Sequence, residues 1–117
     1  MSKNQSIAFL ALGLALTACG EKSAPPSAPA AVSAAIPADA RLAKLYEQTC
    51  KTCHSNAGTG APVAGDTAAW APRLAQGMPT LLNHTLNGYK GMPPLGSCSD
   101  CGEPEFTALI NFMATGK

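Results

Sequence analysis

Residues 50–54 read Cys-Lys-Thr-Cys-His, and the interpretation of the whole chain starts from this pentapeptide. Two thiols three positions apart can bond the two vinyl groups on one edge of a porphyrin, and the histidine that follows can ligate the iron. The sequence therefore predicts one haem, with thioether links at Cys50 and Cys53 and with His54 as the proximal ligand. A thioredoxin-like dithiol is the alternative, but it needs a βαβ context, and the sequence lacks strand-like alternation.

The N-terminus predicts export and lipid attachment. Residues 7–18 form an uncharged apolar run that is too short to span a bilayer as a stable helix but suits a signal peptide. Residues 16–19, Leu-Thr-Ala-Cys, resemble a bacterial lipoprotein cleavage site, so we expect residues 1–18 to be removed and Cys19 to carry lipid. An ordinary secretory peptide, with Cys19 lost or left free, is the alternative. Gly20 after the cysteine favours the outer membrane over the inner one.

The next segment, residues 19–38, is rich in Ala, Pro and Ser. Such a segment cannot bury enough apolar surface to offset its ordering entropy, so we expect a lipid-anchored, disordered linker. The folded part is then residues 39–117. A core this small is marginal by itself, and a covalently held haem would supply much of the missing apolar surface.

The chain has five cysteines, and each has an expected role. Once Cys19, Cys50 and Cys53 are assigned, Cys98 and Cys101 remain. In an oxidising periplasm we expect this pair to form a disulfide across a tight turn. A redox-active dithiol and a two-cysteine metal site are the alternatives, although no histidine or partner motif accompanies the pair.

Capping residues and apolar periodicity predict a series of short helices. Asp39 is a candidate cap for a first helix that runs to about Lys51, and a short helical turn is expected from Asp66 to Trp70. A third helix should begin at Pro79 and end before Gly88. The last should run from about Pro104 to Ala114. Its predicted buried face consists of Phe106, Leu109, Ile110 and Met113.

A methionine in a loop stiffened by glycine and proline is the predicted second iron ligand. Met92 lies in the stretch Tyr-Lys-Gly-Met-Pro-Pro at residues 89–94, where the prolines preset the backbone. Its thioether is a soft ligand that stabilises ferrous iron and raises the potential. Met78 and His84 compete for this role, whereas Met113 fits the core.

Other side chains are expected to support the haem. The imidazole N–H of His54 needs an acceptor, and a backbone carbonyl near Pro62 is the candidate. Trp70 and Arg73 are candidate donors to the haem propionates, with core packing and a solvated charge as the respective alternatives. Tyr46 is expected to pack in the core against the haem.

Taken together, these motifs resemble those of small bacterial class I cytochromes c, and within that group cytochrome c5. The resemblance covers residues 40–115 and rests on CKTCH, on GAPVAGDTAAWAPRLAQGMPTLLNHTLNGYKGMPP and on the Cys98–Cys101 pair before the last helix. It implies an all-α class I cytochrome c fold, with three to four helices wrapped around one covalently attached haem c. It also implies iron ligation by His54 and Met92 and a Cys98–Cys101 disulfide. Residues 102–104, Gly-Glu-Pro, depart from the acidic, proline-free helix start that is more usual in the family.

The expected function is that of a membrane-tethered periplasmic electron carrier in a respiratory chain. With both axial positions filled, no small-molecule substrate reaches the iron, so we expect transient redox partner proteins and no enzyme activity. A haem enzyme or gas sensor with an open or displaceable sixth ligand is the alternative, and Met92 discriminates between the two. The formal net charge of +1 gives no indication of nucleic-acid binding.

Overall fold

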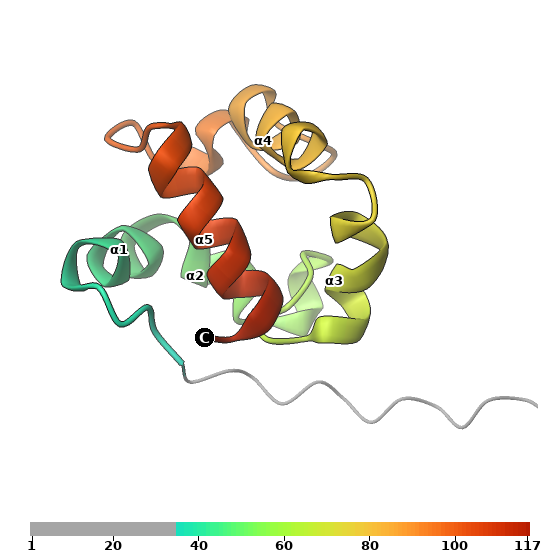
Figure 1. The fold of residues 1–117 in the computed structure, drawn as a ribbon, viewed down its shortest axis with the longest axis horizontal. Coiled ribbons are helices and arrows are strands. Elements are labelled where there is room, and N and C mark those ends of the chain that lie inside the picture. The colour runs from blue at the N-terminus through green and yellow to red at the C-terminus, as the bar shows by residue number, and fades with distance from the viewer. Residues whose placement is uncertain (1–34) are drawn as a thin grey trace, which may run out of the picture.

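The computed structural model describes residues 35–117. The expected signal peptide, Cys19 and the linker as far as residue 34 lie outside the described residues. Residues 35–117 contain short helices and no strand, with one isolated β-bridge between Tyr89 and Met92. Figure 1 shows the helices arranged in a ring, with α5 running along one side of it. In this described part, no helix is long and apolar enough to cross a membrane.

The first helix carries the attachment motif and is longer than expected. Three segments follow one another without a break: α1 (Ala40–Leu45), the π-helical turn η1 (Tyr46–Cys50) and α2 (Lys51–His54). The Asp39 side chain accepts a hydrogen bond from Leu42 N at 2.8 Å, so the predicted N-cap is confirmed. The predicted end near Lys51 is wrong, because the helix continues to His54. Ser55 Oγ donates to Lys51 O at 2.6 Å and completes the last turn.

The loop after His54 folds back through its own backbone. It begins with the 3₁₀ turn η2 (Ala57–Thr59). Further on, Ala64 N donates to His54 O at 2.6 Å, and Gly65 N donates to Met113 O at 2.7 Å. These bonds tie the end of the attachment helix and the end of the last helix to the same loop.

A helix extends where only a short turn was expected. The segment α3 (Thr67–Leu74) includes the expected turn but continues beyond Trp70, with Pro72 inside it. Pro72 lacks an N–H donor and its ring crowds the preceding turn, but the next backbone donors still find partners, as when Ala75 N bonds Ala71 O at 3.1 Å. The longer helix places Trp70 in its middle.

The third predicted helix is confirmed. The segment α4 (Met78–Asn87) includes Pro79 in its first turn and ends before Gly88. The chain then forms a tight turn and the short segment η3 (Pro94–Ser97), which packs against both α4 and η1. This packing brings the segment after Met92 next to the helix turn that carries Cys50.

The last helix, α5 (Glu103–Thr115), extends one residue beyond the predicted range at either end. Glu105 Oε2 accepts a hydrogen bond from Gly102 N at 2.9 Å, and Glu105 also pairs with Arg41 on α1. The bond from Gly102, and then the one from Arg41, hold the pKa of the Glu105 carboxyl below its ordinary value. The unusual Gly-Glu-Pro start therefore forms a capped helix.

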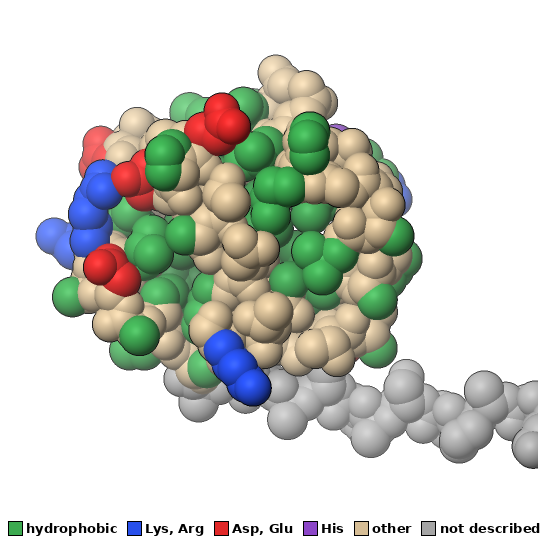
Figure 2. Space-filling view, viewed as in Figure 1, with side chains coloured by type: hydrophobic (Ala, Val, Ile, Leu, Met, Phe, Trp, Pro, Cys, Tyr) green, Lys and Arg blue, Asp and Glu red, His purple; other side chains and the backbone are tan. Residues whose placement is uncertain are grey.

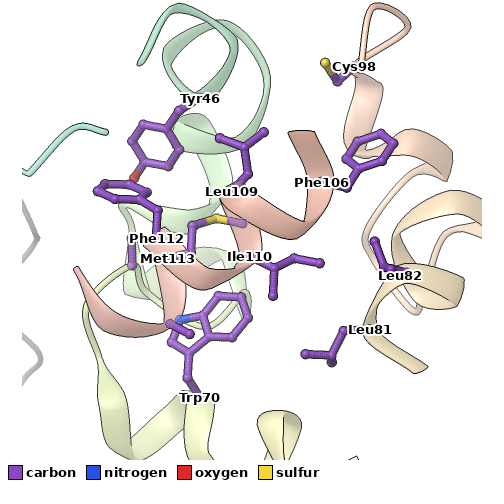
Figure 3. Close-up of a cluster of buried hydrophobic side chains, with 12 residues drawn as sticks. Tyr46, Trp70, Leu81, Leu82, Cys98, Phe106, Leu109, Ile110, Phe112 and Met113 are labelled. Carbon is purple, nitrogen blue, oxygen red and sulfur yellow. The ribbon is translucent and has the colours of Figure 1, made fainter. Parts of the chain in front are cut away.

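The hydrophobic core is centred on α5, which packs against α4, α3 and the first helix. The rings of Tyr46 and Phe112 meet edge to face, with centroids 5.0 Å apart. The Tyr46 hydroxyl has no hydrogen-bond partner among the described residues, and burial raises its pKa. Figure 3 shows this aromatic pair and the α5 side chains that extend from it towards α4. The core cluster comprises Tyr46, Ala64, Trp70, Leu81, Leu82, Cys98, Phe106, Leu109, Ile110, Phe112, Met113 and Ala114.

These positions confirm both the predicted buried face of the last helix and the all-α fold class. The folded part also begins before Asp39, since Pro37 is buried and Ala35 packs against the core cluster. Both residues were expected in the linker.

A disulfide joins Cys98 and Cys101 in the turn between η3 and α5, as the cysteine count and the family resemblance led us to expect. Their Cα atoms are 5.4 Å apart. Cys98 is buried and Cys101 is half-buried, so the bond lies at the edge of the core.

Replacing both residues, Cys98→Ala with Cys101→Ala, should lower the free energy of unfolding of the holo-protein by about 2 kcal/mol. The effect is modest because a loop this short loses little entropy when it is closed. Guanidinium titration followed by circular dichroism measures the change. Reducing the unmodified protein with a phosphine should produce a similar shift and leave the double variant unaffected. A variant as stable as the unmodified protein would contradict this estimate.

Candidate haem site

The two attachment cysteines lie at the end of the first helix as free thiols. Because positions three apart share a face of a helix, Cys50 and Cys53 are brought to the same side of it. Cys50 is half-buried and Cys53 is exposed. Burial raises the pKa of the Cys50 thiol, Cys53 nearby raises it further, and a hydrogen bond with Thr49 Oγ1 at 3.3 Å opposes the shift. Both sulfurs are available for thioether bonds.

The His54 imidazole is buried and held in one tautomer. Its Nδ1 lies 2.8 Å from Pro62 O, and since a carbonyl can only accept, Nδ1 carries the proton. The predicted acceptor near Pro62 is confirmed. Nε2 therefore keeps its lone pair. Burial lowers the pKa of the imidazole, which the bond to Pro62 opposes and the charge of Arg73 reinforces, so the ring is neutral at pH 7. A neutral imidazole with a free Nε2 is the form that ligates iron.

Trp70 is buried in the core cluster, so core packing, one of the two roles expected for it, is confirmed. The indole Nε1–H donates to Val63 O at 2.9 Å, so the single donor of the side chain is already used and the other expected role, a bond to a propionate, is wrong. The ring stacks on that of His54, with centroids 5.8 Å apart and planes at 27°. Arg73 donates one N–H to Ala69 O and keeps further donors, so its propionate role stays a prediction.

Met92 lies in a loop whose backbone is tightly constrained. Tyr89 N donates to Met92 O at 3.0 Å, and Met92 N donates to Tyr89 O at 2.9 Å. Three non-glycine residues in this region, Lys90, Leu95 and Ser97, have positive φ angles of 55°, 59° and 64°. Such residues are uncommon, and each costs about 1–3 kcal/mol that the surroundings must offset. Met92 itself is half-buried.

The competing ligands occupy other environments. Met113 is 4% exposed and belongs to the core, as expected. Met78 packs against the core cluster at the start of α4. The His84 ring stacks on the exposed Tyr89 ring, with centroids 3.9 Å apart and planes at 16°. Met92 stays the predicted second ligand, with Met78 and His84 as its alternatives.

Hydrophobic side chains gather around a hollow on the face shown in Figure 2, between α5 and the helices α3 and α4. Figure 3 shows Trp70, Leu81 and Ile110, from three different helices, pointing towards one region. An apolar lining suits the flat face of a porphyrin. Two free thiols, a neutral imidazole and this lining are what a covalently attached haem requires, so the residues present fit the group.

Sequence reasoning missed two features of this site. Val63 supplies the acceptor for Trp70 through its backbone, so its side chain gives no signal. Gly96 lies beside Met92, and the only sequence signal was its place in a short stretch rich in glycine and proline.

Comparisons with known proteins identify the family. A family model described as "Cytochrome C oxidase, cbb3-type, subunit III" matches residues 37–113. Cytochrome c-555 of Chlorobaculum tepidum is 52% identical over an alignment covering 58% of this chain and 67% of that protein. Cytochrome c5 of Azotobacter vinelandii is 40% identical, with 56% of this chain and 81% of that protein covered.

A solved structure is similar as well. It is described as "Crystal structure of electron transfer complex of nitrite reductase with cytochrome c", and the similar chain in it is 39% identical, with a TM-score of 0.57. The match covers 65% of this chain and 93% of that one. Since the family model also spans most of the sequence, the chain belongs to this cytochrome c family, and it is a small class I c-type cytochrome, an electron carrier with one covalently bound haem c.

Proposed function

We propose that this cytochrome works at the periplasmic side of a membrane, tethered by lipid on Cys19, as a one-electron carrier in a respiratory chain. His54 and Met92 are the axial ligands in this proposal. The observation that carries it is the His54 imidazole at the end of the attachment helix, neutral and fixed through Nδ1 on Pro62 O at 2.8 Å.

Several residues hold the cofactor in this proposal, and each has a separate role. Cys50 and Cys53 fix the porphyrin edge to the helix end, and Pro62 O fixes the orientation of His54. Trp70 stacks on the imidazole and excludes water from one side of it. When bound, the haem supplies an iron that is stable in both the ferrous and the ferric state.

Filling the second axial position with Met92 leaves no room for a substrate at the iron. The protein then transfers electrons and performs no bond chemistry, so it is not an enzyme. Ligation by the Met92 thioether raises the reduction potential of the haem, because a soft ligand favours ferrous iron. A haem enzyme or gas sensor would need a displaceable ligand here, and the constrained backbone around Met92 argues against one.

Redox proteins are the proposed partners. The similar chain of known structure occurs in an electron-transfer complex with nitrite reductase. We infer that this cytochrome also docks briefly on a larger redox protein, through a small interface of the kind that electron-transfer encounters use.

The tether follows from the sequence. Cleavage after residue 18 would leave Cys19 as the lipid-bearing N-terminus. We propose the outer membrane, rather than the inner one, as the place of attachment. The linker between Cys19 and the domain would reach about 60 Å if fully extended as polyproline. Confinement within this distance raises the effective concentration of the haem domain at a membrane-bound partner.

The attachment can be tested by mass and extraction. Protein purified from cells with the maturation machinery should carry the mass of one haem, which acidic acetone does not extract. The double variant Cys50→Ala, Cys53→Ala should lose covalent haem, whereas Cys98→Ala, Cys101→Ala should keep it. A folded, haem-free protein recovered from the wild-type sequence would contradict the proposal.

The second ligand can be tested by spectroscopy. Met92→Ala should abolish the weak far-red band of methionine-ligated ferric haem, lower the potential and allow exogenous imidazole to bind. Met78→Ala is the matched control and should keep the band, because its side chain packs against the core cluster at the start of α4. If Met78→Ala loses the band and Met92→Ala keeps it, the assignment is wrong.

The tether can be tested by cell fractionation. Cys19→Ser should move the protein from the membrane to the soluble periplasm, or block processing, with an unchanged optical spectrum. Reduction by a membrane-bound donor should slow, while reduction by a soluble chemical donor should not. If the unmodified protein is fully soluble and its mature chain lacks Cys19, the proposed tether is wrong and the protein is an ordinary soluble cytochrome.

A further inference from the structure

The end of the Met92 side chain rests directly on a glycine. A methyl group placed on the Cα of Gly96 would lie 3.2 Å from Met92 Cε, closer than the 3.4–4 Å of ordinary van der Waals contact. Among the described residues, no other atom comes within 4 Å of that point, apart from the chain neighbours of Gly96 and the backbone of its own helical turn. The missing side chain of Gly96 therefore leaves a place that the terminal methyl group of Met92 occupies. Gly96 also has a φ of +54°, so a substitution there strains the backbone as well.

A second glycine lies where a side chain would collide with the backbone of the same methionine. A methyl group on Gly88 would lie 2.9 Å from Met92 O and 3.1 Å from Pro94 N. Both contacts are with backbone atoms, so the loop would have to move to make room. Gly88 also has a φ of +82°, which other residues rarely adopt.

The segment between these glycines offers the methionine little freedom. The two hydrogen bonds between Tyr89 and Met92 fix its backbone, and prolines follow it at positions 93 and 94. Gly88 thus leaves room for the backbone carbonyl of Met92, and Gly96 leaves room for the methyl group at the end of its side chain. The sulfur is bonded to that methyl group, so a shift of the methyl group would move the sulfur as well.

We infer that Gly88 and Gly96 are positioning residues for the axial methionine: their missing side chains allow the Met92 backbone and methyl group to pack where the sulfur can present a lone pair to the iron. This inference rests on the proposed ligation by Met92. A thioether is a weak ligand, so a displacement of its methyl group by a few tenths of an ångström shifts the equilibrium between the bound and the free methionine.

Gly96→Ala in the holo-protein is the decisive variant. It should reduce the far-red methionine band of the ferric protein, shift the ring-current-shifted methyl resonance of Met92 in the ferrous protein, and raise the affinity of the ferric protein for imidazole about tenfold. Gly88→Ala should change all three readouts in the same direction. If Gly88→Ala fails to fold, Gly96→Ala still tests the inference.

Two other glycines provide matched controls. Gly60 has a φ of +78°, and a methyl group there would meet nothing within 4 Å, so Gly60→Ala introduces backbone strain without touching Met92. Gly91 lies next to Met92, but a methyl group there would also meet nothing within 4 Å. Both alanine variants should retain the wild-type band and imidazole affinity.

The outcomes separate this inference from the proposed function. If Met92→Ala loses the band while Gly96→Ala behaves like the wild type, Met92 is the ligand and the positioning role is wrong. If Gly60→Ala is as damaging as Gly96→Ala, general strain explains the effect and the inference also fails. If Met92→Ala keeps the band, the proposed ligation itself is wrong.

Discussion

The hydrogen bond between His54 Nδ1 and Pro62 O belongs to a short stretch of backbone on which the rest of the domain depends. Residues 62–65 each bond to another part of the fold. The first and third residues bond His54: the carbonyl of residue 62 accepts from the ring, and the amide of residue 64 donates to the His54 carbonyl. The carbonyl of residue 63 accepts from the indole of Trp70, and the amide of residue 65 donates to the carbonyl of Met113. The attachment helix, α3 and α5 therefore meet at four consecutive residues.

This arrangement explains how so small a domain fixes the orientation of the His54 imidazole. The imidazole is fixed by a carbonyl from the same stretch that anchors Trp70, and the Trp70 ring in turn stacks on the imidazole. Rotation of the ring would break a hydrogen bond and a stacking contact at once. The far end of the domain is less regular. Met92 lies there between Gly88 and Gly96, in a loop with three non-glycine residues at positive φ, and the turn closed by the Cys98–Cys101 disulfide follows.

Much of the fold could be predicted because its signals are local. Asp39 caps the first helix with its own side chain, and the proline and glycine that flank α4 act within a turn of its ends. The attachment motif is equally local, since its chemistry requires adjacent residues. The acceptor near Pro62 was predictable because a histidine that ligates a metal almost always donates its other ring N–H to a carbonyl, a carboxylate or water.

The features that escaped prediction depend on tertiary contacts or on backbone atoms. The continuation of α3 through Pro72 depends on the neighbours that its later turns find. The partner of the Trp70 indole is a carbonyl, and every residue has one, so the sequence does not distinguish Val63 from its neighbours. Likewise, a glycine signals conformational freedom, but only the folded loop reveals that Gly96 lies against the end of Met92.

The junction at residues 62–65 has a consequence for how this sequence can vary. Its contacts use carbonyl oxygens and amide nitrogens, so the bonds themselves require no particular side chain. The burial of Val63 and Ala64 and the φ of +82° at Gly65 limit the size of the side chains that fit there. A substitution that keeps this size would leave the bonds intact, whereas inserting or deleting one residue would shift all four contacts out of register together. The loop that orients the imidazole therefore tolerates a change of side chain more readily than a change of length.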